Sequence, residues 1–453
     1  MKRAVYIAAL LISLTLISAE CPGRRLNVEL AWDKATMILE QISEPEFKDE
    51  VYDIRDFGAN PGPQLSTTFI QKAIDACSDN GGGVVLISEG KYMTGAIHLK
   101  SNVNLHISEN AELGFSTDPN NYLPLVRTRW EGRDCMNYSP LIYANNQENI
   151  AVTGKGTLNG NADNSNWWPW KGRTEYGWKE GMDSQDNAEG RPRLQQYEIE
   201  ETPIEVRMMG KGSFLRPQFI NFVSCRNILV ENLTIKNAPF WIIHPLLSEN
   251  IILRGLIIDS HGPNNDGCDP ESSRNVLIED CYFDTGDDCI AIKSGRNKDG
   301  RRSNAPSENI IVRNCTMHNG HGGVVLGSEI SGGARNIFVE DCRMNSPELE
   351  RAIRIKTNSN RGGTVEHIYV RDIEIGEVKE AILKINCEYD IKSEGRGHFF
   401  PEIRNVVLER ITSEKSKYPV YIKGIEGRNC IDSILLRNCI FEGVERTPYI
   451  EFA

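Results

Sequence analysis

The chain has 453 residues, of which 40% are hydrophobic, and its formal net charge at pH 7 is −12. This length and apolar content are enough for one large core or two ordinary ones. The acidic balance argues against a nucleic-acid partner, because contacts to a phosphate backbone need an excess of basic groups. If the protein binds an acidic ligand, its basic residues must be clustered at the binding site.

The N-terminus has the pattern of a secretory signal. Two basic residues precede an apolar run over residues 4–17, and small residues follow up to Ala19. We expect residues 1–19 to be a signal peptide and the protein to be exported, periplasmic or secreted. Lipid anchoring at Cys21 is the less favoured alternative, because Glu20 stands where a small residue usually precedes a lipidated cysteine. No later stretch approaches ~20 apolar residues, so no membrane span is expected.

Two helices are predicted before the main body of the chain. The first, LAWDKATMILEQI over residues 30–42, belongs to an N-terminal extension over residues 20–50. The second carries Ile70, Ile74 and Cys77 on one face and ends at a run of glycines. We expect it to cap the open end of a stack of strands, whose exposed backbone would otherwise promote aggregation.

Residues 161–217 carry no clear hydrophobic period and contain the run NWWPWKG, with Trp167, Trp168 and Trp170. A segment of this length without a pattern of its own is uncommon as a simple connection. We therefore expect a functional excursion near a binding cleft. Its tryptophans fit either sugar-stacking platforms or packing within the excursion.

A short phrase recurs eight times from residue 226 onward: RNILVENLTI, ENIILRGLII, RNVLIEDCYF, ENIIVRNCTM, RNIFVEDCRM, EHIYVRDIEI, RNVVLERITS and DSILLRNCIF. Apolar residues alternate on both sides of a central break, which predicts two short strands joined by a turn. One such unit cannot bury its apolar face alone, but stacked units form a continuous core. We predict an all-β fold, a right-handed parallel β-helix (a single-stranded solenoid), over residues 51–453.

Two positions of the phrase predict contacts between units. The chain has 12 cysteines, and four of them recur at the same position of the phrase: Cys281, Cys315, Cys342 and Cys439. We expect them to fill one inward column as small apolar side chains and not to form disulfides. The second residue of most phrases is asparagine, and these amides could form a hydrogen-bonded ladder between coils.

Four further segments align without gaps on the strand that follows: NNDGCDPE (264–271), GDDCIAIK (286–293), GHGGVVLG (320–327) and LERAIRIK (349–356). One column of this alignment holds Asp266, Asp288, Gly322 and Arg351. The column before it holds Asn265, Asp287, His321 and Glu350. Since neighbouring coils lie about 4.8 Å apart, the alignment gathers three carboxylates and one histidine in a single patch. Arg354 and Lys356 flank that patch from the fourth segment.

These boxes, in this order on a β-helix, resemble the polygalacturonases of glycoside hydrolase family 28. The segments FGANPG and AIDACSDNGGGVVLISEGKY also resemble the N-terminal cap of that family, so the resemblance covers roughly residues 51–389. It implies hydrolysis of α-linked galacturonic acid in a pectic polysaccharide or oligogalacturonide, without a cofactor or a metal. Asn265 departs from the family, which usually has threonine there, and this bears on the substrate subtype. A rhamnogalacturonan-type pectin hydrolase is the alternative within the same chemistry.

Glycoside hydrolysis needs one protonated carboxyl and one ionised carboxylate. Three clustered carboxylates cannot all ionise cheaply, so we expect at least one raised pKa. By the resemblance, Asp287 is the acid of an inverting reaction, and Asp266 and Asp288 hold and activate the water. His321 would retain the proton of the acid or orient the sugar. The predicted substrate-binding residues are Asn265, Gly322, Arg354 and Lys356, of which the last two would pair with a uronate carboxylate.

Two other classes of function fit the same fold. A β-elimination lyase could use calcium bound by Asp266, Asp287 and Asp288, but the GHG and RIK boxes would then have no role. A carbohydrate-binding β-helix without catalysis would release no reducing ends. Within the hydrolase interpretation, we expect attack at chain ends. The excursion would close the cleft, and its basic runs KGR (171–173) and RPR (191–193) could meet the terminal uronate.

Overall fold

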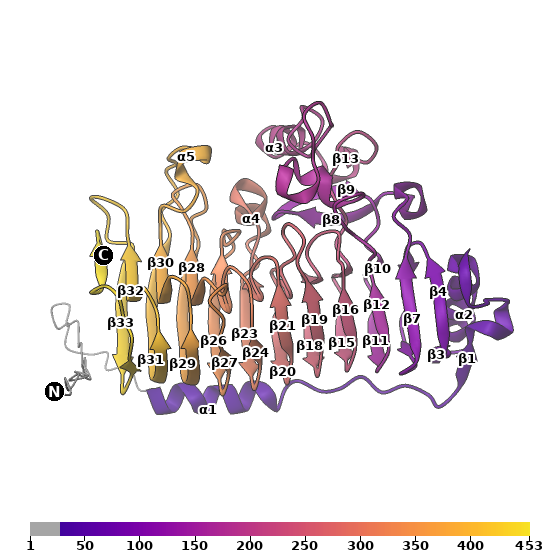
Figure 1. Ribbon diagram of the computed structural model, residues 1–453, viewed down its shortest axis with the longest axis horizontal. Helices are drawn as coiled ribbons and strands as arrows, with labels where there is room; N and C mark the ends of the chain where they lie inside the picture. Colours follow the sequence, from indigo (N-terminus) through magenta and orange to yellow (C-terminus); the bar gives the residue numbers. More distant parts are fainter. Residues whose placement is uncertain (1–27) are drawn as a thin grey trace, which may run out of the picture.

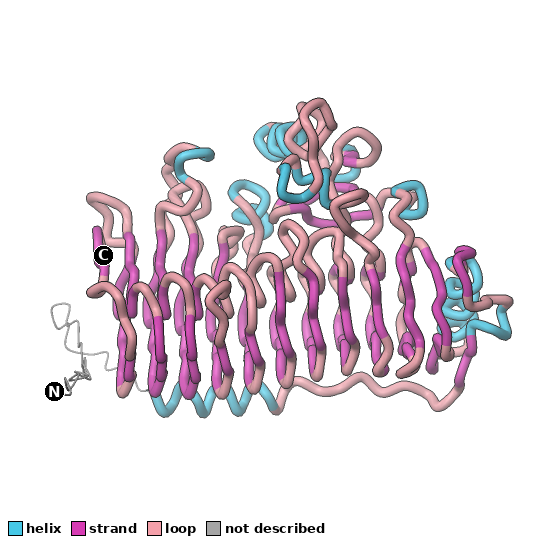
Figure 2. Tube along the Cα trace, viewed as in Figure 1, coloured by secondary structure: helices cyan, strands magenta, loops and turns pink. Residues whose placement is uncertain are grey.

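The computed structural model describes residues 28–453 as one elongated stack of coils (Figure 1). The predicted signal peptide over residues 1–19 and Cys21 lie outside the described residues. Each coil contributes strands to two walls, and the loops between them project mainly to one side (Figure 2). In the part of the chain that the structure describes, no helix is long and apolar enough to cross a membrane.

The longer wall, here called the long sheet, has 22 strands that pair in parallel. They are β1 (Val51–Asp53), β2 (Gly62–Leu65), β3 (Gly83–Ile87), β4 (Gly90–Thr94), β6 (Val103–Ile107), β7 (Ala111–Phe115), β11 (Glu148–Gly154), β12 (Thr157–Asn159), β15 (Arg226–Glu231), β16 (Thr234–Lys236), β18 (Glu249–Arg254), β19 (Ile257–Ser260), β20 (Arg274–Glu279), β21 (Tyr282–Thr285), β23 (Ser307–Arg313), β24 (Thr316–Met317), β26 (Ala334–Glu340), β27 (Arg343–Met344), β29 (Thr364–Glu377), β31 (Glu402–Lys415), β33 (Ile431–Arg437) and β34 (Ile440–Phe441).

The second wall, here called the site sheet, is also parallel and is made in two parts. The first part contains β5 (Ile97–His98), β10 (Ile142–Asn145), β14 (Ile220–Val223) and β17 (Ile243–Leu246), and the second contains β22 (Ile290–Ile292), β25 (Val324–Gly327), β28 (Arg351–Lys356), β30 (Ala381–Asn386), β32 (Tyr418–Lys423) and β35 (Tyr449–Glu451). Bridges at Cys268 join the two parts. The predicted parallel β-helix is confirmed.

The turn residues explain why the coils stack in register. The second residue of each phrase has a positive φ between 53° and 60°, a conformation that asparagine tolerates better than most residues. The predicted amide ladder is confirmed: Asn309 Nδ2 donates to Asn275 Oδ1 at 3.0 Å, and Asn336 Nδ2 donates to Asn309 Oδ1 at 2.9 Å. Identical turns therefore place identical positions of neighbouring coils above one another.

The inward columns are apolar, as the phrase predicts. Cys281, Cys315, Cys342 and Cys439 are all buried, and every cysteine of the described chain is a free thiol. In the same column Leu256 precedes Cys281, and Ile373 follows Cys342. The cysteines thus act as small core residues.

Both predicted N-terminal helices are present. In α2 (Thr67–Asp79), Ile70, Ile74 and Cys77 are fully buried against the first coils, so this helix caps that end of the stack. The earlier helix, α1 (Val28–Leu39), lies along the outside of the long sheet beneath its later strands (Figure 1). Short helical segments occur in the loops: η1 (Ile54–Phe57), η2 (Pro119–Tyr122), α4 (Asn297–Ser303) and α5 (Ile391–Glu394).

The excursion between β12 and β14 rises above the site sheet (Figure 1). It contains η3 (Trp168–Lys171), η4 (Thr174–Tyr176), α3 (Arg191–Ile199), η5 (Ile204–Val206) and β13 (Met208–Met209). It packs on a hairpin that the sequence analysis missed, β8 (Val126–Trp130) and β9 (Arg133–Asn137), which is the antiparallel strand pair of the described sheets. Trp167 is buried and Trp170 packs edge-on against it at 4.8 Å, so these two rings serve as core packing.

Candidate active site

The strand register brings the predicted site residues together. Cys268 bridges Ile290, which pairs with Val324, which in turn pairs with Ile353. Two positions before these residues stand Asp266, Asp288, Gly322 and Arg351. The predicted columns are therefore confirmed.

The three aspartates form one compact cluster. Asp266 and Asp288 are buried, and the side chain of Asp287 is 16% exposed. One carboxylate oxygen from each residue lies within 4.8 Å of the others. Two oxygens that both accept hydrogen bonds from a single water lie roughly 4.5 Å apart. The cluster therefore has the dimensions to hold one water molecule between carboxylates.

Asp266 is the carboxyl whose pKa is raised, to about 7. Burial is the main cause, and the charges of Asp287 and Asp288 act in the same direction. Lys293 opposes this effect, with its Nζ 3.4 Å from Asp266 Oδ2. The other oxygen, Oδ1, has no hydrogen-bond partner among the described residues. Asp266 thus holds a proton near neutral pH and has one oxygen available.

Asp287 and His321 form a pair that holds one proton. His321 Nδ1 lies 2.9 Å from Asp287 Oδ1, and the carboxylate raises the pKa of the imidazole to about 9. Burial acts to raise the pKa of Asp287, but His321 and the more distant lysines bring it below its usual range. The expected acid proton therefore resides on the histidine of the pair, because the half-exposed imidazole holds it more strongly than the carboxylate does.

Asp288 contacts two basic side chains. Lys356 Nζ lies 2.6 Å from its Oδ2, and Arg354 Nη1 lies 3.5 Å from its Oδ1. Both cations also lie 5.3 Å from the ring centre of Tyr389. In this structure the carboxylate that Arg354 and Lys356 contact is Asp288, so their predicted contact with a uronate stays a prediction.

Two predicted substrate-binding residues lie inside the coil. Asn265 is fully buried, accepts from Ser260 Oγ and Gly262 N, and donates to two backbone carbonyls. This arrangement does not fit the predicted substrate contact and instead fixes the loop before Asp266. Gly322 is also buried, and a Cβ there would lie 3.3 Å from Asp288 Oδ1. The glycine thus leaves room for the carboxylate and offers no side chain to a ligand.

Sequence reasoning missed a buried cluster around Lys293. Its Nζ lies 3.3 Å from Asp269 Oδ1 and 3.3 Å from Glu329 Oε2, besides its contact with Asp266. The ring centre of Trp241 lies 4.5 Å from the same atom. Asp269 and Lys293 both belong to the aligned segments, at positions that point out of the core. Charged residues at those positions could have been recognised in the sequence as part of the site.

Ion pairs continue from Lys293 to the tip of the β8–β9 hairpin. Glu329 pairs with Arg296 at 3.6 Å, and Arg296 pairs with Glu131 at 3.2 Å. Arg296 N donates to Gly132 O at 2.9 Å. Gly132 has a φ of +77°, and a Cβ there would lie 2.8 Å from Arg296 N, so only glycine allows this approach.

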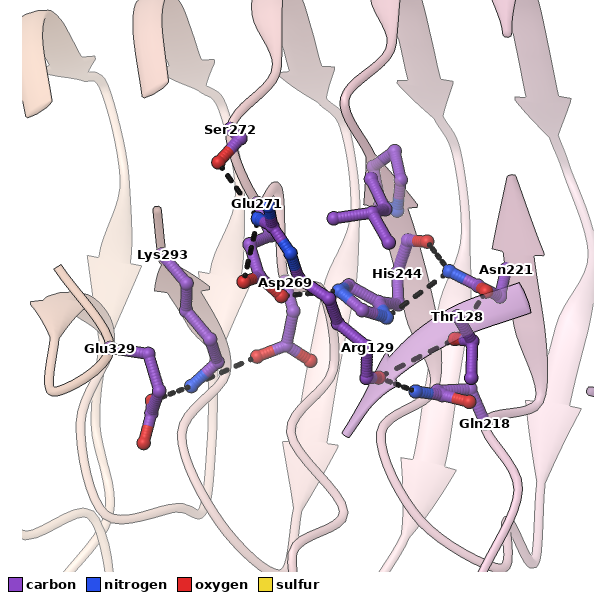
Figure 3. Close-up of polar contacts among 12 residues, drawn as sticks. Thr128, Arg129, Gln218, Asn221, His244, Asp269, Glu271, Ser272, Lys293 and Glu329 are labelled. Atoms are coloured by element: carbon purple, nitrogen blue, oxygen red, sulfur yellow. Dashed lines mark hydrogen bonds and ion pairs between the residues drawn. The ribbon is translucent and has the colours of Figure 1, made fainter. Parts of the chain in front are cut away.

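The body of the hairpin lies across the coils of the site sheet (Figure 1, Figure 3). Thr128 Oγ1 donates to Asn221 Oδ1 at 2.8 Å, and Arg129 Nη1 donates to Glu271 Oε1 at 3.3 Å. The chain enters the hairpin near β10 and touches Arg296 after β22, four coil steps or roughly 19 Å away. The hairpin therefore fills the groove over the site sheet from the N-terminal coils to the aspartate cluster.

Beyond the cluster, the site sheet carries a basic and aromatic column. Arg354 pairs in register with Lys384, Lys384 with Tyr421, and Tyr421 with Tyr449. Tyr421 and Tyr449 stack with ring centres 4.5 Å apart. This column continues on the side away from the hairpin and offers both cations and aromatic ring faces to a ligand.

A family profile, curated relatives and a solved structure all relate this chain to the same group of enzymes. The profile of the family described as Glycosyl hydrolases family 28 matches residues 208–448. A probable polygalacturonase of Vitis vinifera is 30% identical over 82% of this chain and 70% of its own length. An exo-poly-alpha-D-galacturonosidase of Dickeya chrysanthemi is 26% identical over 75% of this chain and 57% of its own length. The crystal structure of an exopolygalacturonase from Thermotoga maritima is 44% identical, with a TM-score of 0.89 over 92% of this chain and 93% of that one.

Proposed function

Because the chain belongs to glycosyl hydrolases family 28, we propose that it is a polygalacturonase that releases galacturonic acid from the ends of pectic chains. The observation that carries end attack is the β8–β9 hairpin, which fills the groove on one side of the aspartate cluster. The similarity to the Thermotoga maritima exopolygalacturonase supports it. We also propose that the protein is exported, since residues 1–19 have the pattern of a signal peptide.

In the proposed reaction, Asp266 and Asp288 act on the attacking water, and the Asp287–His321 pair acts on the leaving oxygen. A water held between Asp266 and Asp288 attacks the anomeric carbon, and Asp288 takes the proton that this water loses. The bond to the glycosidic oxygen breaks, and that oxygen receives the proton that the Asp287–His321 pair holds. Attack opposite to the leaving group inverts the anomeric centre. The products are one galacturonate and a chain shorter by one unit.

The same geometry argues against the two competing classes. In a lyase of the expected kind, the three aspartates would bind calcium, but Lys356 and Arg354 already neutralise Asp288. In a carbohydrate-binding protein without catalysis, the proton that the Asp287–His321 pair holds beside two further carboxyl groups would have no use. A hydrolase transfers that proton to the leaving oxygen.

Chromatography of early products on polygalacturonate tests the proposal. We expect galacturonic acid as the single early product, whereas a series of dimers to pentamers in the first minutes would contradict end attack. A product that absorbs in the near ultraviolet would indicate a lyase. Absence of new reducing ends from this substrate but release from rhamnogalacturonan would move the assignment to the alternative hydrolase.

Asp287→Asn is the matched inactive variant for that assay. It removes the group through which the proton reaches the leaving oxygen, so we expect the rate to fall by ~10² or more. The melting temperature should change little, because the amide keeps the size of the side chain. A near-normal rate in this variant would contradict the assigned role.

A further inference from the structure

Arg216 differs from the other buried basic side chains of residues 28–453. Its guanidinium is fully buried, and its acceptors are neutral: Pro239 O, Pro263 O, Gln185 Oε1 and Asn264 Oδ1. The other buried arginines and lysines each have a carboxylate within ion-pair distance: Arg129, Arg133, Arg207, Lys293, Arg296, Arg354, Lys356 and Arg361. Arg216 therefore brings a positive charge into the interior without a carboxylate partner.

Lys171 adds a second positive charge at the same place. Its Nζ donates to Asn264 Oδ1 at 2.7 Å, and Arg216 Nη2 donates to the same oxygen at 3.0 Å. Within the described residues, no carboxylate lies at ion-pair distance from Lys171. Burial lowers the pKa of Lys171, Glu131 opposes this effect, and the charge of Arg216 acts with burial. The Glu131 carboxylate is itself paired with Arg191 and Arg296. One amide oxygen thus serves two cations, which it cannot neutralise.

The position of this pair is fixed relative to the reaction centre. Asn264 stands two residues before Asp266 on the loop that enters the catalytic strand. The η3 segment that carries Lys171 is held on the neighbouring loop between β16 and β17, where Trp168 Nε1 donates to Ala238 O at 2.9 Å, and Asn265 Nδ2 donates to the same oxygen at 3.1 Å. A Cβ on Gly262 would lie 2.3 Å from Trp168 Nε1, so the contact is close. The Lys171 side chain is partly exposed, contacts Asn264 and lies close enough to Asp287 for that carboxylate to affect its pKa, so we place it at the closed end of the cleft.

A buried charge without a counter-charge is costly, so a protein that keeps one commonly uses it. A carboxylate from a ligand would supply the missing charge. Arg354 and Lys356 are less free for that purpose, because both already contact Asp288. We propose that Lys171 Nζ, with the Arg216 guanidinium behind it, binds the carboxylate of the sugar unit at the closed end of the cleft. This site rests on the proposed function, since it assumes that the terminal unit is a uronate.

Binding of the single sugar tests the site without relying on turnover. Titration calorimetry should compare galacturonate with galactose, which lacks the carboxylate, on the full chain and on Lys171→Met. We expect the variant to bind galacturonate about 10- to 100-fold more weakly, the loss typical of one charged hydrogen bond. Galactose binding should not change. Lys171→Arg should recover part of the affinity, and Lys211→Met, at an exposed lysine of the same excursion, is the control.

Kinetics on digalacturonate provides a second readout. We expect Lys171→Met to raise KM at least about tenfold more than it lowers kcat, because the contact exists before and during the reaction. Equal affinity of the variant and the parent for galacturonate would overturn the site, and so would absence of saturable galacturonate binding by the parent. If the parent does not hydrolyse polygalacturonate, the proposed function is wrong. If the parent is active but Lys171→Met does not change the affinity for galacturonate, only this inference is wrong.

Discussion

Lys293 shows how one buried cation sets the charge of a catalytic carboxyl. It is shared by Asp266, Asp269 and Glu329, so one positive charge faces three carboxyl groups. Burial raises the pKa of Asp269 far above its usual range, as it does to a lesser degree for Asp266. Glu329 is the exception, because Lys293 and Arg296 outweigh burial and lower its pKa. The cluster therefore keeps a proton near the reaction centre at neutral pH.

The substitution Asp266→Asn should stabilise the protein at alkaline pH while removing activity. The folded pKa of about 7 lies above the unfolded value of roughly 3.9. The native state therefore binds this proton more tightly, and the free energy of unfolding falls as pH rises from about 4 to about 7, because the unfolded state releases the proton first. An asparagine cannot ionise, so at pH 8 we expect the free energy of unfolding to rise by ~1 kcal/mol or more. At pH 4 the two proteins should differ little.

Chemical denaturation at both pH values measures this difference. Glu329→Gln is the matched control, because it removes another partner of Lys293 whose pKa is lowered on folding. That group stabilises the native state above its unfolded pKa, so its loss should destabilise the protein at pH 8. The same sign for both variants would contradict the assigned charge states.

At the scale of elements, the β8–β9 hairpin converts an open groove into a cleft with one closed end. Its contacts are unlike those of a surface loop: Trp130 is buried and stacks on Phe240 at 5.1 Å with an interplanar angle of 9°. Arg133 pairs with Glu198 of α3 at 2.6 Å. The hairpin is therefore fixed between the site sheet below and the excursion above.

Shortening the tip of this hairpin should change the product pattern. If residues 129–134 are replaced by a two-glycine turn, the groove on the hairpin side of the aspartate cluster opens, and dimers and trimers should join the early products from polygalacturonate. Circular dichroism and the melting temperature establish that the coils remain folded. A folded variant that still releases galacturonic acid alone would show that another element closes the cleft.

At the scale of the whole molecule, stability comes from columns that run through successive coils. The Cys281 side chain lies in the core next to that of Cys315, and both are free thiols. Each column adds apolar contact between neighbours, so the fold gains stability coil by coil.

The substitution Cys281→Ala should lower stability by roughly 1 kcal/mol, because it leaves a small cavity in a closely packed column. The melting temperature should fall, and turnover should not change, because Cys281 Sγ donates to the backbone oxygens of Leu253 and Glu279 and not to the aspartate cluster. Differential scanning calorimetry and an activity assay check both points. Detection of Cys281 in a disulfide in the purified protein would contradict the column.

The coils and the aspartate cluster could be predicted because each depends on local repetition. The asparagine turns fix the register, and register alone brings Asp266, Asp287 and Asp288 together. The hairpin could not be predicted, because Glu131 and Arg296 meet across four coil steps and nothing periodic relates them. The protonation of His321 also could not be predicted from the sequence, since it depends on the 2.9 Å contact with Asp287 and on the burial of each partner.

Helix α1 links coils that otherwise contact only their nearest neighbours. Lys34 Nζ donates to Asn336 Oδ1 at 2.9 Å, although 302 positions of sequence separate them. The helix packs across Leu277, Ile311, Phe338, Tyr369 and Val407, one from each of five successive coils. During synthesis α1 appears before any of these coils, so its complete docking surface exists only when the last of them has formed. Its attachment is therefore a late event that marks completion of the stack, and afterwards none of the five coils can unwind without first releasing the helix.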